Sequence, residues 1–174
     1  MLTGLKSYLL CLSAAVVALD QFSKWKVEQS MRLYERIEVI PGFFQLAHVT
    51  NDGIAFGLFP SGGSFVGTAI LATLGLLALG VVTFYFLQTP DEQKLLLTAL
   101  ALVLGGAIGN LTDRLMRGEV TDFFDAYIGQ HHWPTFNVAD SAISVGIVLL
   151  AIETLRTRGD QPSDSVDERV ASGA

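Results

Sequence analysis

The chain has 174 residues, of which 51% are hydrophobic and 16% are charged, and its mean hydropathy is +0.47. A soluble domain carries roughly 25% charged residues, so this composition excludes an ordinary soluble protein and indicates an integral membrane protein. The net charge of −6 comes in good part from an acidic stretch after residue 158, and the chain has no basic patch, so we expect no nucleic-acid partner.

Four apolar segments predict four membrane-spanning helices. The second and third carry no charged residue over 24 and 18 positions, which is enough to cross a hydrocarbon core of about 30 Å at 1.5 Å per residue. The first and fourth each contain a single acid, Asp20 and Asp140, close to one end of the segment. The predicted spans are residues 7–23, 64–87, 95–112 and 135–152.

We expect a single, mostly α-helical membrane domain over residues 1–158, followed by a disordered acidic tail over residues 159–174. No small-x-small cleavage site follows the first apolar segment, so we expect that segment to remain in the protein as a span. Gly105 and Gly109 form a GxxxG pair in the third span, and we expect it to serve packing within one chain rather than dimerisation.

An even number of spans places both ends of the chain on one side of the membrane and the two longer connections, residues 24–63 and 113–134, on the other. Lysine and arginine divide almost equally between the two sides, so the positive-inside rule does not fix the orientation. Within the first long connection, residues 36–40 and 43–49 predict two strands joined by a Pro-Gly turn. We therefore expect a small apolar β-sheet between the first two helices, resting on the membrane surface or covering a site.

The candidate metal ligands do not form a recognisable site. The single cysteine, Cys11, excludes an intramolecular disulfide and a cysteine-based zinc cage. The adjacent His131 and His132 point in different directions and do not make a metal site by themselves. We expect no metal and no other cofactor.

Polar residues gather at the ends of the spans opposite the chain termini. In the fourth span Asn137, Asp140, Ser141 and Ser144 have the spacing i, i+3, i+4, i+7, which forms one polar stripe on a helix. Carboxylates at the edge of the hydrocarbon core are costly, so they need a structural or a chemical reason to be there. The gathered residues are Asp20, Lys24, Asn51, Asn110, Asp113, Arg114, Asp122, Asn137 and Asp140.

Several of these charges have simple structural explanations. Asp20 and Lys24 are separated by one helical turn and can pair along the first helix. Asp113 and Arg114 are expected to form a bracing ion pair at the end of the third span. Asp125 is expected to be a surface acid.

Asp122 and Asp140 call for a different explanation. Asp122 lies among apolar neighbours, and Asp140 lies one turn inside the fourth span. Desolvation raises the pKa of a carboxylic acid, and a second carboxylate nearby raises that of one member of a pair further. Two such acids in one pocket would share a proton, as in aspartic proteases. The spacing alone leaves three possibilities open: an aspartic catalytic pair, an ion or proton path, or a structural role.

Five motifs in order give the chain a resemblance to the lipoprotein signal peptidases, the bacterial type II signal peptidases. The resemblance extends over nearly the whole length to about residue 155, and the acidic tail lies outside it. One departure is Ile54, where the family is expected to prefer a small residue. The motifs are DQFSK (20–24), NDGIAFG (51–57), GNLTDR (109–114), VTDF (120–123) and FNVADSAI (136–143).

This resemblance implies an aspartic endopeptidase of the bacterial inner membrane that faces the periplasm and has cytoplasmic termini. It implies cleavage of prolipoproteins immediately before a diacylglyceryl cysteine, by a monomer in contact with phospholipid and without a cofactor. It also implies a mobile periplasmic segment within residues 113–134. The catalytic pair falls on Asp122 and Asp140, and Asp113 takes a structural role. The positions expected to bind substrate or support the pair are Asp20, Lys24, Asn51, Gly53, Asn110, Arg114 and Asn137.

Two other functions remain as alternatives. A small transporter or proton channel could use Asp20 and Asp140 inside the helical bundle, and a membrane scaffold would use neither acid chemically. Cleavage of a lipidated prolipoprotein in detergent separates these possibilities, because neither a transporter nor a scaffold produces a new peptide N-terminus.

Overall fold

The computed structural model describes residues 4–52 and 65–159, and within these ranges it contains four long helices and a four-stranded sheet. The helices are α1 (Gly4–Ser30), α2 (Phe65–Gln88), α3 (Lys94–Arg117) and α4 (Val138–Gly159). The strands are β1 (Arg36–Ile40), β2 (Phe44–Asn51), β3 (Val120–Ile128) and β4 (His131–His132).

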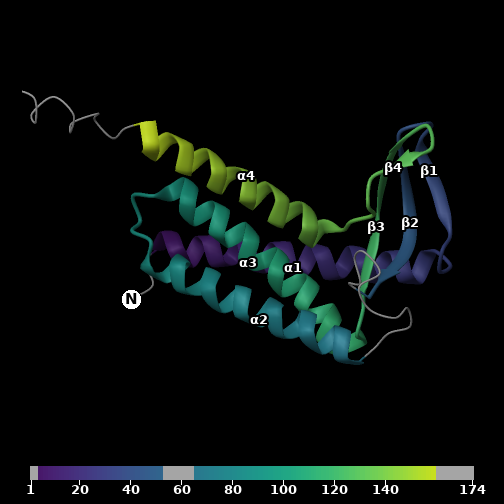
Figure 1. Ribbon diagram of the computed structural model, residues 1–174, viewed down its shortest axis with the longest axis horizontal. Helices are drawn as coiled ribbons and strands as arrows, with labels where there is room; N and C mark the ends of the chain where they lie inside the picture. The colour runs from purple at the N-terminus through teal and green to yellow at the C-terminus, as the bar shows by residue number, and fades with distance from the viewer. Residues whose placement is uncertain (1–3, 53–64, 160–174) are drawn as a thin grey trace, which may run out of the picture.

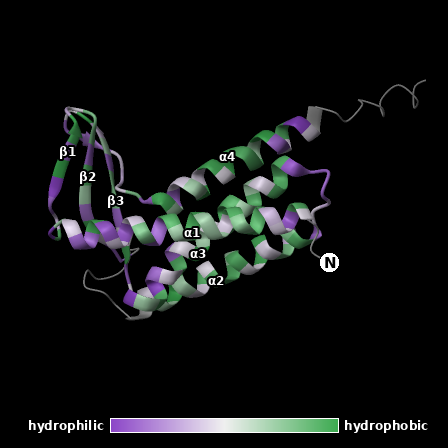
Figure 2. Cartoon of the chain, turned by 180° about the vertical axis from the view of Figure 1, so that it is seen from behind, coloured by the Kyte–Doolittle hydropathy of each residue, from purple (hydrophilic) through white to green (hydrophobic). Residues whose placement is uncertain are grey.

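All four of these helices are long and apolar enough to cross a membrane, as predicted. The helix α3 is central and packs against α1, α2 and α4. In α3, 56% of the span is buried inside the protein, compared with 11% in α2, so α2 presents most of its surface outward. Figure 2 shows hydrophobic residues along the helices and hydrophilic residues gathered in the sheet and at the helix ends.

The helices α1 and α3 extend beyond the predicted spans, and polar side chains that lie there, such as Lys24 and Asp113, are paired inside the protein. The helix α4 begins at Val138, three residues later than predicted, and continues to Gly159. The helix α1 continues past Asp20 and Lys24 to Ser30. The helix α3 ends at a C-cap on Gly118, whose φ of +83° is the left-handed conformation that glycine adopts readily. The predicted tail lies outside the described residues, apart from Gly159 at the end of α4.

Glycines on α3 allow its neighbours to approach closely. A Cβ atom at Gly105 would lie 2.8 Å from Val16 Cβ on α1, and one at Gly106 would collide with the backbone oxygen of Ala139 on α4. A Cβ atom at Gly109 would lie 2.7 Å from the carboxylate of Asp20. The GxxxG pair therefore serves packing within the chain, as predicted.

The sheet is antiparallel with the strand order β1-β2-β3-β4, and it stands at the end of the bundle opposite the first residues of α1 and the last residues of α4 (Figure 1). The first two strands confirm the predicted hairpin. The other two come from the connection after α3, which was not predicted to contain strands. Val27 of α1 and Met31, the residue that follows this helix, pack against Phe123 of β3, so the sheet covers the end of the bundle where the polar groups gather.

The close approach of α3 to α4 generates a stability prediction. We expect Gly106→Ala to destabilise the protein by about 1–3 kcal/mol, because the added methyl group collides with backbone rather than with a flexible side chain. Thermal unfolding in detergent measures the change. Gly80→Ala on α2 is the matched control, since a Cβ atom there meets nothing within 4 Å. Equal melting temperatures for the two variants would contradict the prediction.

Candidate active site

Asp140 is placed by the first turn of α4. The side-chain oxygen of Asn137, the residue before the helix, accepts a hydrogen bond from the Asp140 backbone N–H at 2.9 Å. In return, the Asp140 carboxylate accepts one from the Asn137 backbone N–H at 3.2 Å. This reciprocal arrangement is a capping box, which fixes both side chains and satisfies N–H groups that a helix start leaves without partners.

A second carboxylate caps the same helix from a different element. The Ala139 backbone N–H donates to Asp20 Oδ1 on α1 at 2.9 Å. The N-terminus of a helix carries a partial positive charge, so it stabilises the anionic groups Asp20 and Asp140. The start of α4 is therefore bound to α1 at the level of the candidate site.

Asp122 reaches the same place from β3. Its backbone lies opposite Val49 of β2, and its side chain is only 2% exposed. One carboxylate oxygen accepts a hydrogen bond from Asn137 Nδ2 at 2.7 Å, and the other accepts one from Asn51 Nδ2 at 2.9 Å. Asn137 therefore contacts both acids, Asp122 through its side-chain amide and Asp140 through its backbone N–H.

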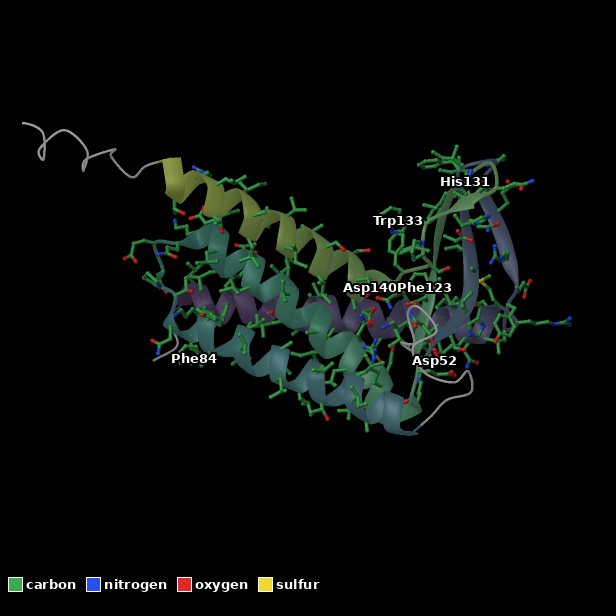
Figure 3. All side chains as sticks on the ribbon, viewed as in Figure 1. Asp52, Phe84, Phe123, His131, Trp133 and Asp140 are labelled. Carbon is green, nitrogen blue, oxygen red and sulfur yellow. The ribbon has the colours of Figure 1, made fainter. Side chains whose placement is uncertain are left out.

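A third asparagine completes the surroundings of the two acids. Asn110 of α3 donates from Nδ2 to Asp140 Oδ1 at 2.7 Å. The amide oxygen of Asn110 accepts hydrogen bonds from Asn137 Nδ2 at 3.1 Å and from Lys24 Nζ at 3.0 Å. The structure thus brings together seven of the predicted site residues from α1, α3, β2, β3 and the start of α4. Figure 3 shows Asp140 at the junction of the bundle and the sheet.

Burial raises the pKa of Asp122 from its ordinary value to about 6. The hydrogen bond from Asn51 opposes this rise, the negative charge of Asp140 adds to it, and Asn137 and Lys24 oppose it further. Asp122 therefore titrates close to neutral pH and can carry a proton there.

Beneath the two acids lies a buried ion cluster. Lys24 Nζ lies 2.7 Å from Asp20 Oδ2 and 2.7 Å from Asp113 Oδ2, and all three side chains are at most 1% exposed. Gln21 Nε2 donates to Asp113 Oδ1 at 2.9 Å. Sequence reasoning missed Gln21, although it follows Asp20 in the DQFSK motif.

The predicted ion pair between Asp113 and Arg114 is wrong. Asp113 faces Lys24, whereas the Arg114 guanidinium donates to the Asn110 backbone oxygen at 3.4 Å. Consecutive residues on a helix point in directions that diverge by about 100°, so Asp113 and Arg114 do not share a face.

The prediction that Asp125 is a surface acid is also wrong. Asp125 is 1% exposed and accepts hydrogen bonds from Gln45 Nε2 at 2.6 Å and Arg36 Nη1 at 3.3 Å, with His132 Nδ1 at 2.8 Å. Its neighbours lie on the strands β1, β2 and β4. Their proximity to Asp125 could be recognised only once β3 was known to join the sheet. These contacts from His132, Gln45 and Arg36 outweigh the effect of burial and lower the pKa of Asp125.

An open groove of about 510 Å³ runs beside Asp140. Residues 133–136 form one wall of this groove, and Ser141, Ser144 and Val145 on α4 form the other. Asp140 lines it and is half-buried, whereas Asp122 lies behind it. The groove therefore gives a bound molecule access to the acid pair through Asp140.

Gly53 lies outside the described residues, as does Ile54. Among the residues that the structure describes, no group of three or more histidine, cysteine, aspartate or glutamate side chains is arranged to hold a metal ion.

The fold and the site define a class of protein: a multi-pass membrane protein in which a helix start and a strand bring two acids together under a small sheet. A family model described as signal peptidase (SPase) II matches residues 12–156. This chain therefore belongs to the signal peptidase II family, whose members are peptidases acting on the signal peptides of lipoproteins.

Individual relatives agree with this assignment. The chain is 41% identical over 167 residues to the lipoprotein signal peptidase of Alteromonas mediterranea, covering 93% of this chain and 86% of that protein. It is 44% identical over 140 residues to that of Geobacter sulfurreducens, covering 80% and 86%, respectively. A solved bacterial membrane enzyme superposes with a TM-score of 0.76 at 27% identity, covering 91% of this chain and 95% of the other. A second one gives a TM-score of 0.73 at 30% identity, covering 92% and 95%.

The ion cluster beneath the acids generates a stability prediction. We expect Lys24→Met to destabilise the protein by about 3–5 kcal/mol, because it leaves two buried carboxylates without their cation. Thermal unfolding in detergent measures the loss. Lys26→Met, an exposed lysine two positions further along α1, is the control and should melt like the wild type. A wild-type melting temperature for Lys24→Met would show that the cluster contributes little.

Proposed function

We propose that Asp122 and Asp140 are the catalytic pair of an aspartic endopeptidase, which cleaves prolipoproteins immediately before a diacylglyceryl cysteine. The observation that carries this proposal is the position of Asn137, which binds both carboxylates at once. A residue that contacts both acids fixes their rotamers and keeps them near enough to act on one water molecule.

The two acids have surroundings suited to different tasks. Asp140 lines the groove at the N-terminus of α4, where an anion is stabilised, so it is the acid that accepts a proton from the attacking water. Asp122 is buried behind it and titrates near pH 6, so it is the acid that donates a proton to the carbonyl oxygen of the scissile bond. Transfer of a proton to the leaving amine then completes the cleavage.

The substrate fits the position of the groove. Its walls are mostly apolar and include the exposed Ser144 and Val145 of α4, so a signal peptide can remain in the membrane while its end reaches Asp140. The acyl chains of the lipidated cysteine can remain among membrane phospholipids. Because Gly105 and Gly109 are used for packing inside the chain, we propose that the enzyme works as a monomer.

The other predicted residues take supporting roles. Asn51, Asn110 and Asn137 hold the acids, while Asp20, Lys24 and Asp113 brace the helices beneath them. Arg114 and Gly53 are proposed to contact substrate or lipid. The sheet is proposed to face the periplasm, with both chain ends in the cytoplasm.

The assignment of the pair predicts the effect of two substitutions. We expect Asp122→Asn and Asp140→Asn each to reduce cleavage of a lipidated prolipoprotein by about 10²–10⁴-fold, because each removes a group that transfers a proton. The assay detects the new N-terminal cysteine by mass spectrometry, and melting temperatures confirm that the variants are folded. Asp91→Asn, between α2 and α3, is the control and should cleave normally. Normal cleavage by either site variant would sink the assignment.

The titration of Asp122 predicts a pH profile. Because the protonated form of Asp122 is the working form and its pKa is raised to about 6, kcat/KM should fall as the pH rises through this value. The hydrogen bond from Asn51 opposes the rise, so Asn51→Ala should move the inflection to higher pH. Gln29→Ala, an exposed residue near the end of α1, should leave the profile unchanged. An inflection that stays in place in Asn51→Ala would argue against Asp122 as the acid.

A further inference from the structure

One buried carboxylate that the proposed mechanism does not use joins all four strands of the sheet. Asp125 lies on β3, and its side chain contacts Arg36 of β1, Gln45 of β2 and His132 of β4. Asp122 and Asp125 are three residues apart on one strand, so their side chains lie on opposite faces of it. Asp125 therefore acts on the sheet rather than on the reacting atoms.

The contact with His132 matters because β4 is held weakly by its backbone. This strand has two residues and pairs with β3 only through Tyr127 opposite His132 and Ile128 opposite His131. The His132 ring also stacks on Tyr127, with ring centroids 4.9 Å apart and planes inclined by 11°. The Asp125 hydrogen bond and this stack are the side-chain contacts that the structure shows between β4 and the sheet.

The chain leaves β4 directly into residues 133–136, the wall of the groove beside Asp140. Four backbone hydrogen bonds hold this wall on β3. Trp133 N–H donates to the Ala126 oxygen at 2.8 Å and Phe136 N–H donates to the Phe124 oxygen at 3.0 Å. The Phe136 oxygen in turn accepts from Phe123 N–H at 3.1 Å and from Phe124 N–H at 2.8 Å. Figure 3 shows Trp133 between His131, at the tip of the sheet, and Asp140. The position of β4 therefore determines where the wall begins.

We propose that Asp125 is a positioning residue for substrate binding: by holding His132, it fixes residues 133–136 as the wall of the groove. This rests on the proposed function, in which the groove receives the substrate. Since the hydrogen-bond partners of Asp125 include neither acid of the proposed pair and Asp125 does not line the groove, its loss should weaken binding and leave the chemical step nearly unchanged.

The kinetic test uses His132→Phe, which keeps a ring to stack on Tyr127 and removes the nitrogen that contacts Asp125. We expect KM for a lipidated prolipoprotein to rise by about three- to tenfold while kcat stays within about twofold. His131→Phe is the matched control, one residue earlier on the same strand, and should leave both constants unchanged. Asp125→Asn retains an oxygen facing His132, so its KM should lie between those of the wild type and Asp125→Ala. An unchanged KM in His132→Phe and Asp125→Ala, or a loss confined to kcat, would overturn the proposal.

A second measurement does not depend on turnover. Amide hydrogen exchange of Trp133 and Phe136 reports whether the wall stays on β3, and we expect exchange about tenfold faster in His132→Phe but not in His131→Phe. Wild-type exchange in His132→Phe would overturn the positioning role whether or not the protein cleaves prolipoproteins. If the wild type produces no cleavage, the proposed function fails, and the exchange rates still decide whether Asp125 holds the wall.

Discussion

The hydrogen bonds around the first turn of α4 are the constraint on which the rest of the site depends. Asn137 caps this helix, contacts Asp140 through its backbone and contacts Asp122 through its side chain. Carboxylates near hydrocarbon are costly unless donors surround them. Here the donors are amide groups held by three separate elements, so the acids can be buried only when α3, α4 and the sheet are assembled.

The ion cluster around Lys24 extends this constraint to α1. Lys24 contacts Asp20, Asp113 and Asn110, and Asp20 in turn caps α4. Lys24 therefore orients Asn110, which binds Asp140. It also pairs with Asp20, which binds the start of α4. Gly109 leaves room for the Asp20 carboxylate between α1 and α3. The close packing of these two helices and the placement of the Asp20 charge therefore depend on the same residue.

The sequence predicted what depends on local pattern, and it missed what depends on pairing across the chain. Apolar runs predicted the four helices, and the Pro-Gly turn predicted the hairpin of β1 and β2. The pairing of Asp113 with Lys24 was missed because Arg114, its neighbour in sequence, was taken as its partner. Consecutive residues on a helix point in different directions, so Asp113 and Arg114 do not face each other. The burial of Asp125 was missed because β3 forms only beside β2, after more than sixty intervening residues. The proposed roles of Asp122 and Asp140 came from the family resemblance, since spacing alone left three possibilities open.

The two acids come from elements whose positions are fixed independently. The capping box sets Asp140, whereas the strand register opposite Val49 sets Asp122. The two acids come together only if the sheet packs on the helical bundle. Val27 and Met31 make this contact with Phe123, the residue next to Asp122. An apolar contact between a helix end and a strand therefore determines the geometry of the acid pair as much as the asparagines do. A bulge between Leu46 and Val49 shifts the β2–β3 register by one residue, so Asp122 lies opposite Val49 rather than opposite His48, where the register before the bulge would place it.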